Sequence, residues 1–302
     1  REMVAPGSVA SLDGFELASD APEQARRVAL AKWLTRPDHP LTARVMVNRL
    51  WHYTFGTGIV DTPSDFGANG TKPVHPQLLD WLADELIRSQ WSLKHVHRLM
   101  LLSEAFKQSS EPDSKALAID ADARLLWRFP PRRLEAEAIR DSMLVASGVM
   151  DWRMGGPGFF LQKVEQDNVY RYFPKEEVGP AEYRRMVYLN RVRQEQDPVF
   201  GAFDCPSGNQ VVPKRVRSNT PLQALNLFNS PFVMQQSDLL AERLKREAGG
   251  EPEGQVALAF QWMLGRLPDD YERDISMELI GKEGLAAFCR AMLNSSEFLF
   301  IF

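Results

Sequence analysis

The sequence lacks the long apolar run that a membrane-spanning helix needs. A bilayer core requires about 18 or more consecutive apolar residues, and no stretch of the 302 residues reaches that length. Cysteine is also scarce: the chain has two, Cys205 and Cys289, and neither belongs to a Cys-x-x-Cys pair. We expect no membrane span and interpret the cysteines as free thiols. A disulfide between them stays open, because sequence spacing alone does not decide pairing.

The common catalytic motifs are missing too. There is no Gly-x-Ser-x-Gly, no phosphate-binding loop, no Gly-x-Gly-x-x-Gly and no His-Glu-x-x-His. Without Cys-x-x-Cys-His, this chain cannot attach a c-type haem covalently. Histidine is rare, and His95 and His97 lie about 200° apart around a helix, so they cannot bind one metal ion from the same face. We expect neither a metal site nor a cofactor in this chain.

Composition and charge are those of an ordinary globular chain. Apolar residues make up 44% and charged residues 25%, and the formal net charge is −4. We therefore expect neither nucleic acid nor an anionic membrane surface as a partner. The length suits one large domain or two closely packed halves. The chain starts Arg1-Glu2-Met3 without an apolar signal segment, so we expect it to be a piece of a longer protein.

Helical periodicity dominates the sequence. Residues 1–21 show little of it and are interpreted as a linker or the remnant of an upstream region, and 22–302 as a single mostly helical domain. Two sub-halves, 22–150 and 200–302, joined by an irregular or β segment, are the alternative organisation. Proline and glycine mark the helix ends. The predicted helices lie at 22–35, 41–55, from Pro76, after Ser92, at 134–149, from Pro221, and at 231–247, 253–264, 268–280 and 283–293.

The stretch near residues 155–200 has a different pattern. Three glycines open it, at 155, 156 and 158, and two short β-like runs follow at Val169–Phe173 and Met186–Asn190. The expected fold class is therefore mainly α: a multi-helix globular domain with a small β hairpin or sheet insertion near residues 155–200.

A polar line lies along the helix predicted at 41–55. Arg44, Asn48 and His52 recur every four residues, with Trp51 and Phe55 beside them. Such a line can be the wall of a ligand site, where arginine and asparagine bind an anion or sugar hydroxyls. It can also be a buried polar network that fixes how the helix meets the next loop. We prefer the structural interpretation, because helices of large α domains commonly carry such networks.

Other chemistry-bearing residues have two interpretations as well. Asp61 and Asp65 can act as acid and base or hold a cation, but they can also cap turns, which we prefer. Cys205 has no base or cation beside it in the sequence, so an unreactive thiol is favoured. The seven tryptophans, four of them before residue 92, can form a sugar platform or belong to the core.

An ordered series of motifs runs through nearly the whole chain, from about residue 24 to 302. Its segments are His39–Trp51 (HPLTARVMVNRLW), Phe55–Val60, Asp65–Gly67, His75–Ala83 (HPQLLDWLA), Trp91–Lys94, Arg133–Glu137 (RLEAE), Ile139–Asp141, Gly155–Pro157, Phe203–Pro206 (FDCP), Thr220–Leu225 (TPLQAL), Asn229 and Leu293–Phe298 (LNSSEF). Together they resemble domain of unknown function number 1553, a mostly helical bacterial domain that often closes planctomycete cytochrome c proteins.

The resemblance implies context rather than mechanism. Proteins of this family usually carry a signal peptide, often a cytochrome c domain, and a second uncharacterised helical domain before this one. It implies a periplasmic or cell-surface protein, haem only on a separate upstream domain, and those two domains as partners. It supplies no established catalytic residue. By their chemistry, the candidate ligand-site residues are Arg44, Asn48, His52, Asp61, Asp65, His75, Asp80, Arg140 and Asp141.

Three functions are consistent with these patterns. The preferred one is a docking or accessory module in a redox or polysaccharide-processing system, because enzyme motifs are absent. The first alternative is an enzyme acting on sulfated or other polysaccharide, with Arg44, Asn48, His52 and His75 around an anionic group and Asp61 or Asp65 moving protons. The second is a glycan-binding module, which requires at least two tryptophans exposed in one groove.

Overall fold

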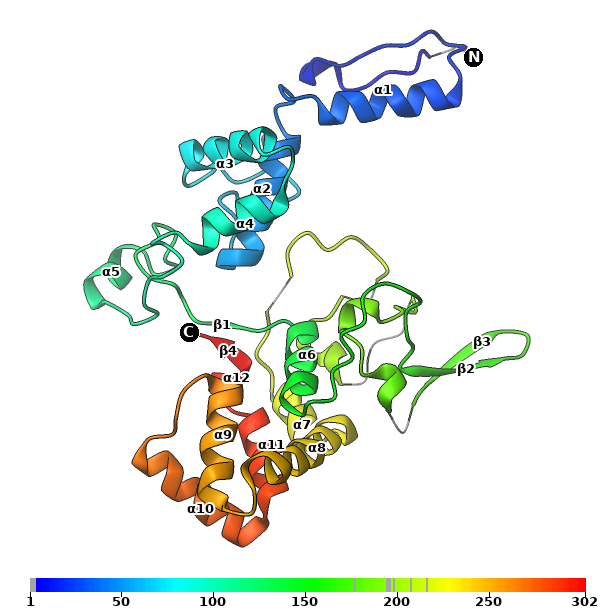
Figure 1. The fold of residues 1–302 in the computed structure, drawn as a ribbon. Coiled ribbons are helices and arrows are strands. Elements are labelled where there is room, and N and C mark those ends of the chain that lie inside the picture. The colour runs from blue at the N-terminus through cyan, green and yellow to red at the C-terminus, as the bar shows by residue number, and fades with distance from the viewer. Residues whose placement is uncertain (1–3, 176–177, 194–196, 198, 207, 216) are drawn as a thin grey trace. The chain divides into compact units, whose positions relative to one another are not determined.

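The computed structural model describes residues 4–175, 178–193, 197, 199–206, 208–215 and 217–302 (Figure 1). In this part of the chain, twelve α-helices hold about half of the residues, and two small antiparallel sheets have two strands each. The predicted fold class, mainly α with a small hairpin insertion, is confirmed. Contacts divide the chain into two compact units, Arg1–Pro130 and Pro131–Phe302. These bounds differ from the sub-halves considered from the sequence.

The first unit consists of short helices joined by loops. Its elements are the 3-10 helix η1 (Ala10–Leu12) and the α-helices α1 (Glu23–Thr35), α2 (Thr42–Phe55), α3 (Pro76–Arg88), α4 (Leu93–Leu101) and α5 (Ser114–Ile119). The core is formed where α2, α3 and α4 pack together, around Val47, Leu82, Leu86 and Val96. The segment before α1 folds back on that helix, because Trp33 Nε1 donates to the carbonyl of Asp13 at 3.2 Å.

Local sequence explains where the helices of this unit begin and end. Helix α2 starts beside His39, whose Nδ1 accepts the backbone N–H groups of Leu41 and Thr42 at 3.2 Å. It ends at Gly56, which has a left-handed φ of 90° that glycine adopts at no steric cost. Ser92 caps α4, as predicted, by accepting from His95 N–H at 3.3 Å.

The second unit holds the other helices and both sheets. Its elements are β1 (Arg132–Arg133), α6 (Ala136–Ala146), β2 (Gln162–Gln166), β3 (Tyr170–Pro174), the 3-10 helices η2 (Pro180–Glu182), η3 (Met186–Tyr188) and η4 (Phe200–Phe203), α7 (Pro221–Asn229), α8 (Pro231–Ala248), α9 (Pro252–Leu264), α10 (Asp270–Glu283), α11 (Leu285–Leu293), α12 (Ser296–Leu299) and β4 (Phe300–Ile301). Helix α6 belongs here because it packs on α8, η3 and η4. The core gathers Ile139, Met143, Leu240 and Phe288.

The β insertion is one hairpin, in which β2 pairs antiparallel with β3. The predicted run Val169–Phe173 is close to β3. The predicted run Met186–Asn190 is wrong as a strand, since its first residues form the 3-10 helix η3. The reason is tertiary: the carboxylate of Asp141 accepts the N–H of Met186 at 2.7 Å, and the Met186 side chain is buried in the core.

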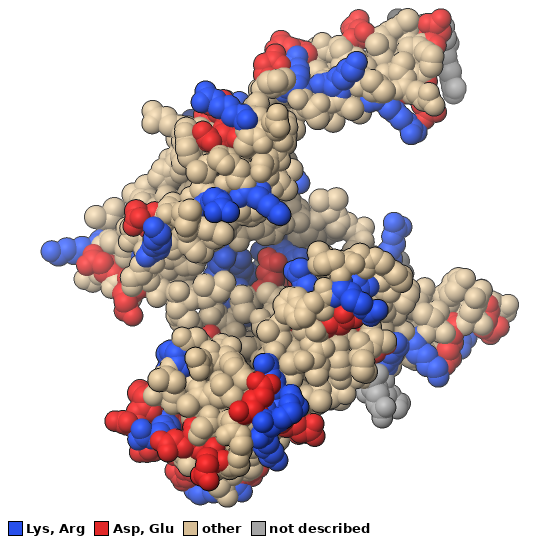
Figure 2. All heavy atoms as spheres, viewed as in Figure 1, with Lys and Arg blue, Asp and Glu red and all other residues tan. Residues whose placement is uncertain are grey.

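Surface charge follows the composition. On the face in view, acidic and basic side chains are interspersed, most densely over the C-terminal helices (Figure 2). Among the described residues, no helix combines the length and apolar character needed to cross a bilayer.

Candidate functional site

In the first unit, the polar line of α2 is used for internal pairing. The Asn48 side chain is 0% exposed. Its Nδ2 donates to the Val60 carbonyl at 2.9 Å, and its Oδ1 accepts the Val60 N–H at 2.8 Å. Arg44 donates from Nε to Asp80 Oδ1 at 2.6 Å and from Nη1 to the Pro40 carbonyl at 2.6 Å. His52 is buried one turn further along the helix.

The loop after α2 places its polar candidates in turns. Asp65 Oδ1 accepts the N–H of Gly67 at 2.8 Å, which is the geometry of an Asx turn. The backbone N–H of Asp61 donates to Thr71 Oγ1 at 3.0 Å. His75 Nε2 lies 3.0 Å from the Arg124 carbonyl and lines a cavity of about 50 Å³. That volume suits about one or two water molecules rather than a substrate.

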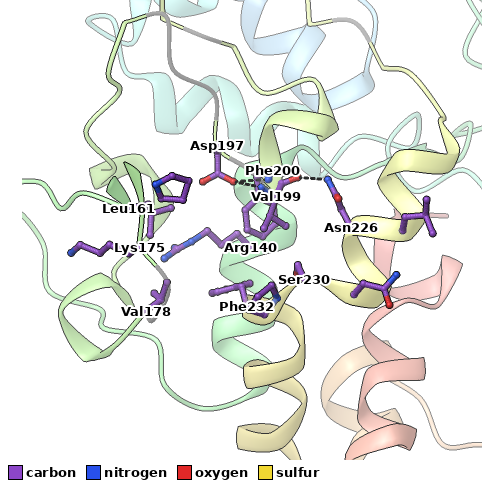
Figure 3. A pocket seen from close by; sticks show the side chains of 14 residues that line it. Arg140, Leu161, Lys175, Val178, Asp197, Val199, Phe200, Asn226, Ser230 and Phe232 are labelled. Atoms are coloured by element: carbon purple, nitrogen blue, oxygen red, sulfur yellow. Dashed lines mark hydrogen bonds between the residues drawn. The ribbon is translucent and has the colours of Figure 1, made fainter. Parts of the chain in front are cut away.

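The second-unit candidates Arg140 and Asp141 fix the turns that follow the hairpin. Arg140 donates from Nη1 to the Arg184 carbonyl at 2.9 Å and from Nη2 to the Glu182 carbonyl at 2.6 Å. Its guanidinium also lies over the ring of Phe232. Burial lowers the pKa of Arg140 to about 10, although the nearby carboxylates, chiefly Asp141, act to raise it. Burial also raises the pKa of Asp141, although the Met186 N–H opposes this shift. Arg140 borders a cavity of about 360 Å³, shown in Figure 3.

The structure therefore does not assemble the sequence-predicted residues around one cavity that it describes. Arg44 and Asp80 form one pair, Asn48 holds Val60, and Asp65 closes a turn. Their measured contacts are those of a scaffold, and the ligand-site assignment stays a prediction.

A polar network around Glu137 was missed as a site. Arg215 binds Glu137 through both outer nitrogens, at 2.6 and 3.0 Å, and Arg191 Nη2 lies 2.7 Å from Cys205 Sγ. Burial alone favours the neutral form of Glu137, but Arg215 outweighs it and lowers the pKa of the carboxyl. The RLEAE and FDCP motifs were the available signal, because they supply Glu137 and Cys205.

The same network decides the chemistry of Cys205. Its thiol is buried, and burial together with Glu137 raises its pKa to about 11, although Arg191 opposes the shift. A nucleophilic cysteine needs a thiolate near neutral pH. Cys205 is therefore a structural thiol, and Cys289, whose pKa burial raises to about 12, is another. Both are free in the structure.

A second cluster lies nearby in the chain, just before the start of α6. Arg133 donates from Nη2 to Asp204 at 2.8 Å and from Nη1 to Gln223 Oε1 at 2.5 Å. The Asp204 carboxylate also accepts the N–H and hydroxyl of Ser218. This cluster ties β1 to the loop before α7, so it stabilises the unit rather than forming an open site.

A groove with two tryptophans lies between α6, α8 and α9. Its cavity measures about 360 Å³, and two tryptophans line it: Trp152, which follows α6, and Trp262 of α9. The Trp152 side chain is 64% exposed. Trp262 is partly buried against the core. The condition set for a glycan-binding module, at least two tryptophans exposed in one groove, is met only in part, because Trp152 is exposed and Trp262 is half-buried.

Arg243 of α8 is held rigidly within this groove. Its guanidinium carbon lies 3.9 Å from the centre of the Trp262 ring. Its Nη1 donates to the carbonyls of Val145 and Ala146, at 3.0 and 2.9 Å, and its Nε to Glu247 at 3.0 Å. Gly148 makes room for it, since a Cβ there would lie 2.9 Å from Arg243 Cδ. The guanidinium thus covers one face of the Trp262 ring.

No set of three or more His, Cys, Asp or Glu side chains in the described ranges is arranged to hold a metal ion. The groove residues Trp152, Trp262 and Arg243 bring no carboxylate, thiol or imidazole of their own.

The model of the family PSD1, described as a protein of unknown function (DUF1553), matches residues 26–280, and the chain belongs to this family. The resemblance recognised in the sequence motifs is confirmed. No curated protein and no solved structure matches the chain.

Proposed function

We propose that this chain is a non-catalytic module that binds a saccharide chain in the groove of Trp152, Trp262 and Arg243. The observation that carries the proposal is the presence of two tryptophans on one groove of about 360 Å³. That size falls within the range of small-ligand pockets, roughly 300–1,000 Å³.

The chemistry of the groove suits sugar rings. A pyranose presents a face of C–H groups, which packs on the flat ring of Trp152, and a rim of hydroxyls, which need donors and acceptors. Arg243 supplies planar N–H donors that its contacts hold in place. Because Glu247 pairs with Arg243, the groove carries little net charge, and we expect neutral polysaccharide to bind better than sulfated polysaccharide.

The test is affinity electrophoresis of the chain in gels containing neutral or sulfated polysaccharides, followed by calorimetry with oligosaccharides of the retained polymer. Trp152→Ala removes an exposed ring, so the fold should persist while affinity falls by about thirtyfold, as for an aromatic hot spot. Trp81→Ala is the matched control, since Trp81 is 48% exposed but belongs to α3. Equal losses in both variants, or no retardation by any polymer, would reject the proposal.

The setting of this module is part of the same proposal. The family resemblance supports a place in the periplasm or at the cell surface of a planctomycete-type bacterium. It also supports a longer protein with a haem-bearing cytochrome c domain and a second helical domain. Binding polysaccharide would then hold such a redox protein at its polymer.

A second candidate function, docking to a partner domain, rests on helix α7. Leu222, Leu225 and Phe228 recur every three residues and stay exposed, so one face of this helix has an apolar stripe. Docking predicts that a cytochrome c domain from a member of this family co-sediments with the chain. It also predicts that Phe228→Asp abolishes the complex and leaves polysaccharide binding intact. Absence of a complex with the unchanged chain would remove this candidate.

The enzyme alternative remains a prediction with its own test. If Arg44 and His75 bind a sulfated sugar, then Arg44→Ala and His75→Ala should abolish turnover of sulfated polysaccharide without unfolding the protein. Turnover that survives both substitutions would contradict it.

A further inference from the structure

A second cavity of about 360 Å³ lies in the same unit, between the hairpin, η4 and the start of α8 (Figure 3). It shares no residue with the tryptophan groove. Its walls are mainly apolar, and Val178, Val199, Phe200 and Phe232 provide much of them. A concave, mainly apolar wall with a few polar atoms is the usual make-up of a small-molecule site.

The charges around this cavity balance one another, which limits the charge of its ligand. Arg140 borders it but is 0% exposed, and both outer nitrogens of its guanidinium already donate to carbonyls. Lys175 pairs with Glu182 at 2.7 Å. The remaining charge, the carboxylate of Asp197, lies close enough to Arg140 for the two to interact. An anion would find no open cation here, so an uncharged ligand fits best.

Two hydrogen-bond acceptors on the wall, on Asp197 and Asn226, are available to a ligand, and the exposed side chain of Asn229 lines the same cavity. Asp197 Oδ1 accepts the N–H groups of Val199 and Phe200, at 3.0 and 2.6 Å. Its other oxygen receives no hydrogen bond from the described residues, and in Figure 3 it points away from those amides, towards Leu161. Asn226 donates to the Val199 carbonyl at 3.3 Å, which leaves its side-chain oxygen to accept. Both groups are acceptors, so the ligand should carry a donor.

We propose that this cavity binds an uncharged, mainly apolar small molecule that donates a hydrogen bond, from a hydroxyl or N–H group, to Asp197. The site is separate from the proposed saccharide groove, and either proposal can fail without the other.

The probe is N-phenyl-1-naphthylamine, an uncharged diaryl amine with one N–H, whose fluorescence rises in apolar surroundings. We expect saturable binding at one site per chain. Leu225→Arg places a charge on the cavity wall and should weaken binding at least tenfold. Leu222→Arg is the matched control: both leucines belong to α7 and are 57% exposed, but Leu222 does not line the cavity. The control variant should bind within about twofold of the unchanged chain.

Asp197→Asn tests the hydrogen bond. The variant keeps an oxygen for the Val199 and Phe200 amides but presents N–H groups in place of the second acceptor. The substitution should weaken the binding of N-phenyl-1-naphthylamine by about five- to tenfold. The affinity for the hydrocarbon 1-phenylnaphthalene, which has no N–H, should change by less than twofold. Unsaturable fluorescence, or equal losses in both leucine variants, would overturn the cavity site. Equal weakening of both probes by Asp197→Asn would overturn the role of Asp197.

Discussion

The pairing of Asn48 with Val60 makes a quantitative prediction about the first unit. Asn48→Ala removes two hydrogen bonds, each contributing about 1 kcal/mol net. It also leaves the N–H and carbonyl of Val60, a residue 1% exposed, without partners. Stranding these groups adds about 1 kcal/mol or more. We expect the free energy of unfolding of this unit to fall by about 3 kcal/mol, and its Tm by about 12 °C for a unit of this size.

Gly58 gives an independent probe of the same contact. A Cβ at this position would lie 2.5 Å from the Val60 carbonyl oxygen and 2.9 Å from Asn48 Nδ2. Gly58→Ala should therefore be destabilising by about 1–3 kcal/mol. In the Asn48→Ala background the amide is absent, so the same substitution should cost less, with a coupling of about 0.5 kcal/mol or more. Asn69→Ala, an exposed asparagine in the same loop, is the control and should stay within about 0.5 kcal/mol.

The assay is urea unfolding followed by tryptophan fluorescence, fitted to two transitions because the chain has two units. Only the transition of the first unit should move. If Asn48→Ala leaves that transition unchanged but abolishes binding of a sulfated sugar, Asn48 is a ligand residue and the structural reasoning is wrong.

Three further predictions concern the second unit. At pH 8, about one in a thousand Cys205 thiols is ionised, and the ionised fraction of Cys289 is smaller. Ellman's reagent should therefore label both cysteines slowly until guanidinium unfolds the chain. Fast labelling of the native protein would contradict their burial. Hydrogen bonds from Arg266 lower the pKa of Glu272 from its ordinary 4.5 to about 2, so their stabilisation is present above pH 4.5 and is lost as the pH falls towards 2. Because Arg266 is 38% exposed, Arg266→Ala should cost only about 1 kcal/mol at pH 7, and the difference from the unchanged chain should vanish near pH 2 in thermal unfolding. Arg133→Lys keeps the charge but loses the planar guanidinium that donates to both Asp204 and Gln223. Urea unfolding should show that the free energy of unfolding falls by about 2–3 kcal/mol. A decrease below about 0.5 kcal/mol would mean that the planar geometry is dispensable.

The helices were predictable because local chemistry sets their ends. Proline is the first residue of α3, α7, α8 and α9, where its missing N–H costs nothing. Glycine was a less certain guide. Gly281 was expected to end a helix, but α10 continues through it to Glu283 and stops at Gly284, whose φ is 87°. Gly281 does not adopt the left-handed φ of Gly284, so it continues the helix, at a cost of about 1 kcal/mol relative to alanine.

The binding surfaces could not be predicted in the same way. Periodicity selected Arg44 and Asn48 because they share a helix face, but a single helix does not reveal whether its partner is a ligand or a loop. Trp152 and Trp262 belong to distant parts of the sequence and meet through the packing of α6, α8 and α9. The motifs were more informative about architecture, since they held Glu137 and Cys205 of one buried network.

The short sheet of β1 and β4 has a mechanical consequence. Arg132 pairs with Ile301 and Arg133 with Phe300, so the two ends of the second unit leave it side by side. The Leu134 N–H adds a further bond to the Leu299 carbonyl at 2.8 Å. Tension applied to these ends would open the bonds one after another, as in unzipping, rather than load them together. The same adjacency would let this unit be inserted into a surface loop of a host protein without spreading the flanks of that loop.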